Sequence, residues 1–176
     1  MHQSSIDKMK YFRDKYLNAF ANSSLSVADI GSQNVNGTYR PLFENPNWTY
    51  TGIDVLPGAN VDVVLESAYE WKNVESEKFD VVISGQTLEH VEFFWLTLLE
   101  ISRILKKGGV CCIIVPGAGP EHRFPVDCWR FFPDGLRAMA KYAKWEILEV
   151  TTVWKNNDAA GEKWKDSLLV ARKPVA

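Results

Sequence analysis

Four apolar segments of the chain end in small or polar residues whose types suit one kind of ligand. These residues are Asp29 with the loop at 31–37, Asp54, the run at 66–68 and the run at 84–86. A glycine in the first loop lets the backbone approach a ligand closely, because glycine has no Cβ. A carboxylate at the end of a second strand can accept hydrogen bonds from ribose hydroxyls. The pattern therefore indicates a site for a nucleoside.

The same segments lack the sequence patterns that bind phosphate groups. Neither the P-loop pattern G-x-x-x-x-G-K-S/T nor the dinucleotide pattern G-x-G-x-x-G occurs. The predicted crevice also carries carboxylates, which repel phosphates. A nucleoside without phosphates, such as a sulfonium nucleoside, fits these residues better than a nucleotide does.

Hydrophobic periodicity and turn residues divide the chain into strands and helices. We expect strands at 26–31, 50–54, 60–65, 79–85, 110–115, 145–154 and 167–171, and helices at 5–21, 38–44, 92–106 and 133–142. The basic and glycine residues at 106–109 should end the third helix. Only residues 155–166 separate the last two strands, so the final strand should run antiparallel to its neighbour.

The alternation of strands and helices favours right-handed crossovers and a parallel sheet covered on both faces. We therefore predict an α/β fold: a Rossmann-like doubly wound sheet of about seven strands, mostly parallel, with one antiparallel strand near the C-terminus. In such sheets ligands bind outside the carboxyl ends of the strands, at the point where the strand order reverses. All four groups of residues would then converge on one crevice.

The composition excludes several classes of partner. The chain has 176 residues, a net charge of -2 and a pI of about 5.9, so it offers no basic footprint for nucleic acid. No apolar run reaches the ~18 residues of a membrane span, and no signal-peptide pattern opens the chain, so we expect a cytoplasmic protein. The spacing of Cys111, Cys112 and Cys128 argues against a disulfide framework. No coherent set of metal ligands is visible, so no metal site is predicted.

Four motifs between residues 26 and 117 carry a resemblance to a known family. They are VADIG at 27–31, YTGID at 50–54, FDVVISGQTLEHV at 79–91 and EISRILKKGG at 100–109. In this order and spacing they resemble the motifs of the class I S-adenosylmethionine-dependent methyltransferases, in particular the small ubiE-like branch. The resemblance implies S-adenosyl-L-methionine as methyl donor, S-adenosyl-L-homocysteine as product and a reversed seventh strand.

The resemblance also assigns a cofactor site. Its residues, in chain order, are Asp29, Gly31, Ser32, Gln33, Gly37, Asp54, Val55, Leu56, Glu66, Ser67, Ala68, Ser84, Gly85, Gln86 and His90. Asp54 would bind the ribose, residues 66–68 would contact the adenine, and residues 84–86 would contact the methionine tail. Two alternatives stay open: the run at 66–68 could start a helix, and His90 could order residues 84–86 instead of touching the ligand. The family often has further glycines where this chain has Gln33 and Val35.

We expect a single domain over residues 1–176. It would comprise an N-terminal helix at 1–24, a cofactor-binding core at 25–117, a substrate-side loop at 118–132, and a C-terminal helix and strand pair at 133–176. The loop is the candidate acceptor site, because a rigid sheet positions such loops for function.

The loop at 118–132 supplies the groups for chemistry on an acceptor. His122 is the natural general base near neutral pH, with Asp127 as its orienting partner or an alternative base. Arg123 and Arg130 could hold an anionic acceptor, and Trp129 is a further candidate contact. A hydroxyl acceptor would need the base, whereas a carboxylate or amine acceptor would need little or none.

The resemblance thus implies a methyltransferase that acts on a small-molecule acceptor, and the breadth of the family makes a sugar or natural-product intermediate the leading candidate. No nucleic acid or membrane partner is expected, and the compact length is compatible with a homodimer. Two other functions stay open. One is a cofactor-binding regulatory subunit without activity, which the altered glycine loop allows. The other is a nucleotide-dependent oxidoreductase, which the missing pyrophosphate loop disfavours.

Overall fold

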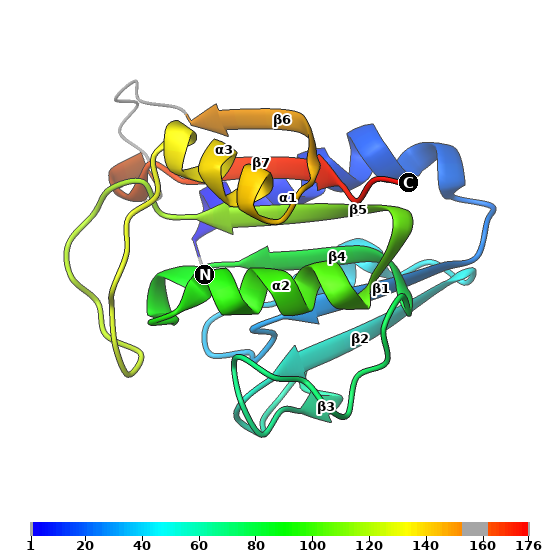
Figure 1. Cartoon of the computed structure of the whole chain (residues 1–176), viewed down its shortest axis with the longest axis horizontal. Helices are drawn as coiled ribbons and strands as arrows, with labels where there is room; N and C mark the ends of the chain where they lie inside the picture. Colours follow the sequence, from blue (N-terminus) through cyan, green and yellow to red (C-terminus); the bar gives the residue numbers. More distant parts are fainter. Residues whose placement is uncertain (1, 153–161, 176) are drawn as a thin grey trace.

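The structure is a computed structural model that describes residues 2–152 and 162–175, and it is built around one sheet (Figure 1). Within these residues the sheet has seven strands in the order β3-β2-β1-β4-β5-β7-β6. The strands are β1 (Leu25–Ile30), β2 (Trp48–Asp54), β3 (Val63–Val64), β4 (Phe79–Gly85), β5 (Leu105–Val115), β6 (Glu146–Thr152) and β7 (Ser167–Arg172).

Strand directions confirm the predicted Rossmann-like sheet. The pairs from β3 to β5 are all parallel, and β7 runs antiparallel to both β5 and β6. The chain passes from β1 to β2 on one side and later to β4 on the other, so the strand order reverses beside β1. A ligand site is expected at the carboxyl ends of these strands.

Helices cover both faces of this sheet. On one face lies α1 (Gln3–Phe12), which continues through the turns Arg13–Leu17 and Asn18–Phe20; on the other lie α2 (Phe94–Ile104) and α3 (Pro133–Tyr142). Pro133 opens α3, where its missing N–H costs nothing and its fixed φ suits the first turn.

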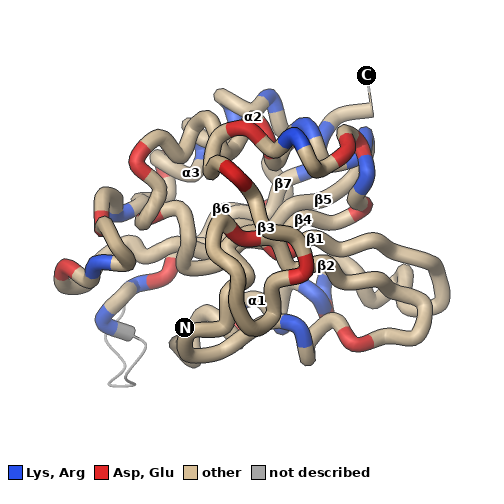
Figure 2. Tube along the Cα trace, turned by 90° about the horizontal axis from the view of Figure 1, so that it is seen from below, with Lys and Arg blue, Asp and Glu red and all other residues tan. Residues whose placement is uncertain are grey.

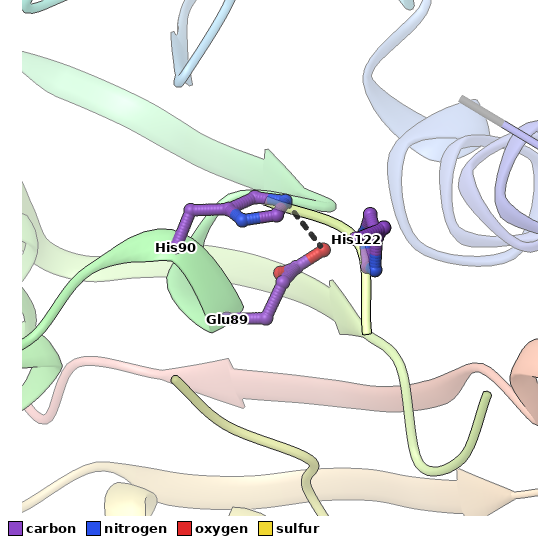
Figure 3. A group of neighbouring side chains, drawn as sticks. All are labelled: Glu89, His90 and His122. Carbon is purple, nitrogen blue, oxygen red and sulfur yellow. Dashed lines mark ion pairs between the residues drawn. The ribbon is translucent and has the colours of Figure 1, made fainter. Parts of the chain in front are cut away.

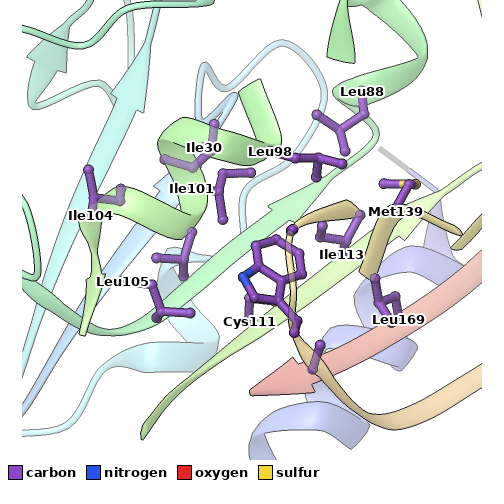
Figure 4. Packing of buried hydrophobic residues seen from close by; sticks show 14 of the residues in the cluster. Ile30, Leu88, Leu98, Ile101, Ile104, Leu105, Cys111, Ile113, Met139 and Leu169 are labelled. Atoms are coloured by element: carbon purple, nitrogen blue, oxygen red, sulfur yellow. The ribbon is translucent and has the colours of Figure 1, made fainter. Parts of the chain in front are cut away.

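Alternating side chains of the central strands feed two separate cores. In β5, Cys111 and Ile113 pack toward α2 and α3, whereas Cys112 and Ile114 pack toward α1. Strands alternate in this way because successive side chains point to opposite faces. Figure 4 shows Ile101 of α2 among the residues of the first core. Cys111 and Cys112 are therefore both buried, one in each core.

Two predicted helical segments are corrected by the structure. The helix expected at 38–44 is only the 3₁₀ turn Arg40–Phe43, in a segment that holds Pro41 and is closed by Pro46, neither of which can donate a helical hydrogen bond. The helix end expected at 106–109 instead belongs to β5. Gly108 N–H donates to Lys173 O and Lys173 N–H donates to Gly109 O, both at 2.9 Å. Pairing with the end of the chain therefore outweighs the local helix-stop signal.

The acidic and basic residues of the chain are interspersed. Lys and Arg residues lie between Asp and Glu residues around the trace (Figure 2). None of the helices in residues 2–152 and 162–175 combines the length and the apolar content needed to cross a membrane.

Candidate active site

A cavity of about 550 Å³ lies at the carboxyl ends of β1, β2 and β4. This volume lies in the ordinary range for small-molecule sites. The loop at 118–132 forms its far wall, where His122 and residues 123–126 line it. The predicted meeting of strand ends and loop in one crevice is therefore confirmed.

Most of the predicted site residues line this cavity. Those that do are Gly31, Gln33, Gly37, Asp54, Val55, Leu56, Ala68, Gly85, Gln86, His90, His122 and Arg123. Those that are not among its lining residues are Asp29, Ser32, Glu66, Ser67, Ser84, Asp127, Trp129 and Arg130. For this second group, direct contact with a ligand stays a prediction.

Asp54 links the first loop to the end of β2. Its carboxylate accepts hydrogen bonds from the backbone N–H of Gln33 at 2.9 Å and from that of Leu56 at 3.1 Å. A carboxylate has about four acceptor positions, so positions remain for the hydroxyls of a ribose. The hydrogen bond from Gln33 also attaches the loop at 31–37 to β2, although this loop lacks the further glycines that are common in the family.

Three polar residues near the strand ends lie outside the cavity lining and form hydrogen bonds next to it. Asp29 is buried and accepts a hydrogen bond from the Tyr50 hydroxyl; burial raises the pKa of its carboxyl to about 7. Ser84 donates to the carbonyl of Ile30 at 3.0 Å, and Ser32 donates to that of Asn60 at 3.1 Å. These bonds fix the ends of β1 and β4.

Two glycines permit the close packing of this edge. Gly31 has φ of +77°, and a Cβ there would lie 2.1 Å from the Thr87 hydroxyl oxygen. A Cβ on Gly85 would lie 1.9 Å from the Tyr39 hydroxyl oxygen. Any larger residue would push these neighbours and distort the cavity floor.

The side of the cavity assigned to adenine is apolar. Val55, Leu56, Leu65 and Trp71 line it together with Ala68, a lining suited to a flat aromatic base. The alternative of a helix start at 66–68 is wrong, because no helix occurs between β3 and β4.

Polar atoms of residues 67 and 68 form hydrogen bonds within the protein. Ser67 Oγ accepts from the backbone N–H of Tyr69 at 3.0 Å, and the carbonyl of Ala68 accepts from the Thr97 hydroxyl at 2.9 Å. Glu66 is exposed beside them.

Three hydrogen bonds attach the loop at 118–132 to the segment after β4. The His90 ring donates from Nδ1 to the carbonyl of Val126 at 2.6 Å. The backbone N–H of Cys128 donates to the carbonyl of Glu89 at 2.7 Å, and the Trp129 indole N–H donates to that of Val91 at 3.0 Å. These bonds hold the loop against residues 89–91, which follow β4.

The structure brings together the predicted pair His122 and Asp127. The His122 backbone N–H donates to Asp127 Oδ2 at 2.7 Å, and its Nδ1 lies 3.3 Å from the same oxygen. Arg130 donates to Asp127 Oδ1 at 2.6 Å and holds the pKa of that carboxyl well below its usual range. Burial lowers the pKa of His122 below its ordinary value despite Asp127. His122 is therefore neutral near pH 7, as a base must be.

The three predicted acceptor residues lie in different places. Arg123 lines the cavity but is exposed and pairs with Glu121 at 2.6 Å. Arg130 donates to the carbonyl of Pro120 at 2.7 Å as well as to Asp127, so it braces the loop. The Trp129 ring packs edge-on against Phe94, with centroids 5.4 Å apart.

Sequence reasoning missed Glu89. This residue follows β4 in the 3₁₀ turn Leu88–His90, and its carboxylate extends toward the rings of His90 and His122 (Figure 3). Its side chain is fully buried, and neither oxygen has a hydrogen-bond partner among the described residues. Burial raises the pKa of its carboxyl to about 8. The adjacent glutamate and histidine in the motif at 79–91 were the available signal.

The structure brings together three possible metal ligands that no sequence pattern indicates. One ligand atom from each of Glu89, His90 and His122 lies within 4.8 Å of the others. His122 is separated from the other two by about thirty residues of sequence, so only the folded loop brings them together.

Comparison with known proteins decides the family. Residues 28–113 match the family model described as a methyltransferase domain. Over these residues the chain contains a class I S-adenosylmethionine-dependent methyltransferase domain. S-adenosylmethionine is the cofactor typical of this family, in agreement with the motifs, and the oxidoreductase alternative is set aside.

Solved structures share the fold of this methyltransferase. A 1,6-didemethyltoxoflavin-N1-methyltransferase from Burkholderia thailandensis, with its substrate and S-adenosylhomocysteine bound, aligns with a TM-score of 0.69 at 17% identity, over 97% of this chain and 84% of the other. A SAM-dependent methyltransferase from Methanosarcina mazei aligns with a TM-score of 0.68 at 15% identity, over 92% and 98%. The cyclase SpnF also aligns, with a TM-score of 0.69 at 17% identity, over 97% and 82%. No curated protein matches the sequence significantly.

Proposed function

We propose that this methyltransferase transfers the methyl group to a small-molecule hydroxyl acceptor that binds in the same cavity as the cofactor. The observation that carries this proposal is the continuity of the cavity. One hollow extends from Asp54 at the end of β2, past Gln86 after β4, to His122 on the loop. A donor and an acceptor in one hollow can be aligned for in-line transfer, which depends on orientation.

The residues present fit the cofactor. Asp54 would accept hydrogen bonds from the ribose, the apolar wall from Val55 to Trp71 would cover the adenine, and Gln86 would lie near the methionine tail. When bound, the cofactor supplies an activated methyl group on a positively charged sulfur. The chain's part is to orient the two reactants and to exclude water.

The acceptor would lie against the loop at 118–132. Phe124 and Trp164 line the cavity there, and the Trp164 ring lies 4.4 Å from that of His122. We assign the removal of the hydroxyl proton to His122, in the tautomer whose Nδ1–H faces Asp127 Oδ2 at 3.3 Å and whose Nε2 can accept. Arg123 would contact an anionic part of the acceptor.

The size of the cavity supports a small acceptor. A volume of about 550 Å³ must hold both reactants, so a sugar or natural-product intermediate fits better than a macromolecule. Two structural relatives also act on small molecules, in both cases at a nitrogen: the 1,6-didemethyltoxoflavin-N1-methyltransferase and a phosphoethanolamine N-methyltransferase from Haemonchus contortus.

Ligand-induced thermal stabilisation tests the cofactor assignment. S-adenosylhomocysteine should raise the melting temperature, whereas NAD and ATP should not, because the cavity has no pyrophosphate loop. At a concentration about 100 times Kd the added stability would be about 2.7 kcal/mol. Differential scanning fluorimetry checks this. A folded protein that shows no shift at millimolar S-adenosylhomocysteine would overturn the proposal.

A further inference from the structure

We propose that Glu89, His90 and His122 form a binding site for a divalent transition-metal cation at the acceptor end of the cavity. Figure 3 shows the carboxylate between the two imidazoles. The His90 Nε2 lies 3.8 Å from Glu89 Oε1, and the three ligand atoms lie within 4.8 Å of one another. Metal bonds of about 2.1 Å would place such atoms about 3.0–3.5 Å apart. Side-chain rotations that move each atom by about 1 Å would complete the site.

His90 already has the outer hydrogen bond typical of a metal ligand, and His122 has a carboxylate beside its ring. Such a histidine usually donates its other ring N–H to a carbonyl or a carboxylate, which fixes the tautomer and the ring. His90 donates Nδ1–H to the carbonyl of Val126 at 2.6 Å. In His90, Nε2 is thereby left with its lone pair. The Nδ1 of His122 lies 3.3 Å from Asp127 Oδ2 and 3.4 Å from the Arg130 guanidinium, which can only donate. His122 offers its Nε2 lone pair to a cation in the tautomer whose Nδ1–H faces Asp127.

Glu89 supplies an independent observation. A fully buried carboxylate without a hydrogen-bond partner is costly, and native structures rarely retain one without a reason. A cation bound at this position would give the carboxylate the partner that it lacks among the described residues.

The donor set selects the class of cation. Two imidazole nitrogens and one carboxylate suit Mn²⁺, Fe²⁺, Co²⁺ or Zn²⁺, whereas Ca²⁺ and Mg²⁺ prefer oxygen ligands. Positions left over would face the cavity, where His90 and His122 are wall residues.

The consequence for catalysis rests on the proposed function. A cation at this position would bind the acceptor oxygen and lower the pKa of its hydroxyl. The His122 lone pair then holds the cation, and the role of His122 as a base applies to the metal-free enzyme. Cation binding itself requires neither cofactor nor acceptor, so it can be measured separately.

Calorimetry on the full chain tests the site. Chelator-treated protein is titrated with MnCl₂, and separately with ZnCl₂, in the absence of cofactor. We expect one cation per chain. Glu89→Gln, His90→Asn and His122→Asn should each weaken binding at least about 100-fold, since even an outer-shell change costs about 10- to 100-fold. Glutamine is neutral and has nearly the size of glutamate, so Glu89→Gln should fold about as stably as the metal-free protein.

Two matched controls separate this site from surface binding. His2→Asn changes the remaining histidine of the chain, which lies on the cavity wall outside the cluster. Glu75→Gln changes an exposed carboxylate. Both should bind the cation as the unaltered chain does. No binding by the unaltered chain, or equal binding by all five variants, would overturn the inference. If S-adenosylhomocysteine still binds in that case, the methyltransferase proposal is unaffected.

Discussion

Replacement of Asp54 by alanine should weaken the binding of S-adenosylhomocysteine by about 100- to 10,000-fold. Two hydrogen bonds from ribose hydroxyls to a carboxylate are worth about 1.5–3 kcal/mol each. The same substitution removes the acceptor of the Gln33 and Leu56 N–H groups, which hold the first loop against β2. Isothermal titration calorimetry measures the change.

Asp54→Asn and Glu75→Ala complete this experiment. Asparagine keeps one acceptor oxygen, so its loss of affinity should lie between those of the unaltered chain and the alanine variant. Glu75 is exposed and lies outside the cavity, so its alanine variant should bind normally. Unchanged affinity in a folded Asp54→Ala protein would move the ribose site elsewhere.

Replacement of His122 by alanine should slow turnover of a hydroxyl acceptor by about 100- to 10,000-fold, the usual contribution of a general base. Cofactor affinity should stay nearly normal, since the ribose and adenine contacts lie on other strands. Cys128→Ser, an exposed position of the same loop, is the control and should leave turnover unchanged. Near-normal turnover and acceptor affinity in His122→Ala would assign the histidine to loop structure alone.

The pH profile of the metal-free enzyme gives a second measure of the same role. A base works as the neutral imidazole, so turnover should fall as the pH decreases through the pKa of His122. Burial lowers that pKa, and the decrease should therefore occur below the ordinary histidine value of about 6.5. Asp127→Asn removes a neighbour that raises the pKa, so the decrease should move to still lower pH. A shift toward higher pH would contradict this arrangement.

The centre of the sheet could be predicted because β4 and β5 contain short apolar runs. Residues 81–83 and 111–115 are buried, and no helical or loop pattern competes with them. The start of β5 could not be predicted, because local signals at 106–109 favour a helix end. Its pairing with Lys173, more than sixty residues away, decides the conformation. Local sequence contains no record of such a partner.

The site divides in the same way. Asp54 and Gln86 end strands, and the sheet alone brings strand ends together, so their positions on the cavity wall followed from the fold. Asp29 and Ser84 occupy equivalent places in the sequence, but their side chains satisfy Tyr50 and Ile30 instead of reaching the cavity. Glu89 was missed because the burial of its carboxylate away from hydrogen-bond partners results from tertiary packing. Only the folded loop shows a buried carboxylate beside two imidazoles.

Transfer of labelled methyl groups from S-adenosylmethionine to a panel of sugars, nucleotide sugars and natural-product intermediates tests the central claim most directly. The domain should label at least one hydroxyl acceptor and release S-adenosylhomocysteine in equal amount. His122→Ala should lose most of this activity, with the cofactor still bound. A chain that binds S-adenosylhomocysteine in this cavity yet labels no acceptor, with or without Mn²⁺ or Zn²⁺, would contradict the claim and indicate a cofactor-binding protein without methyl transfer.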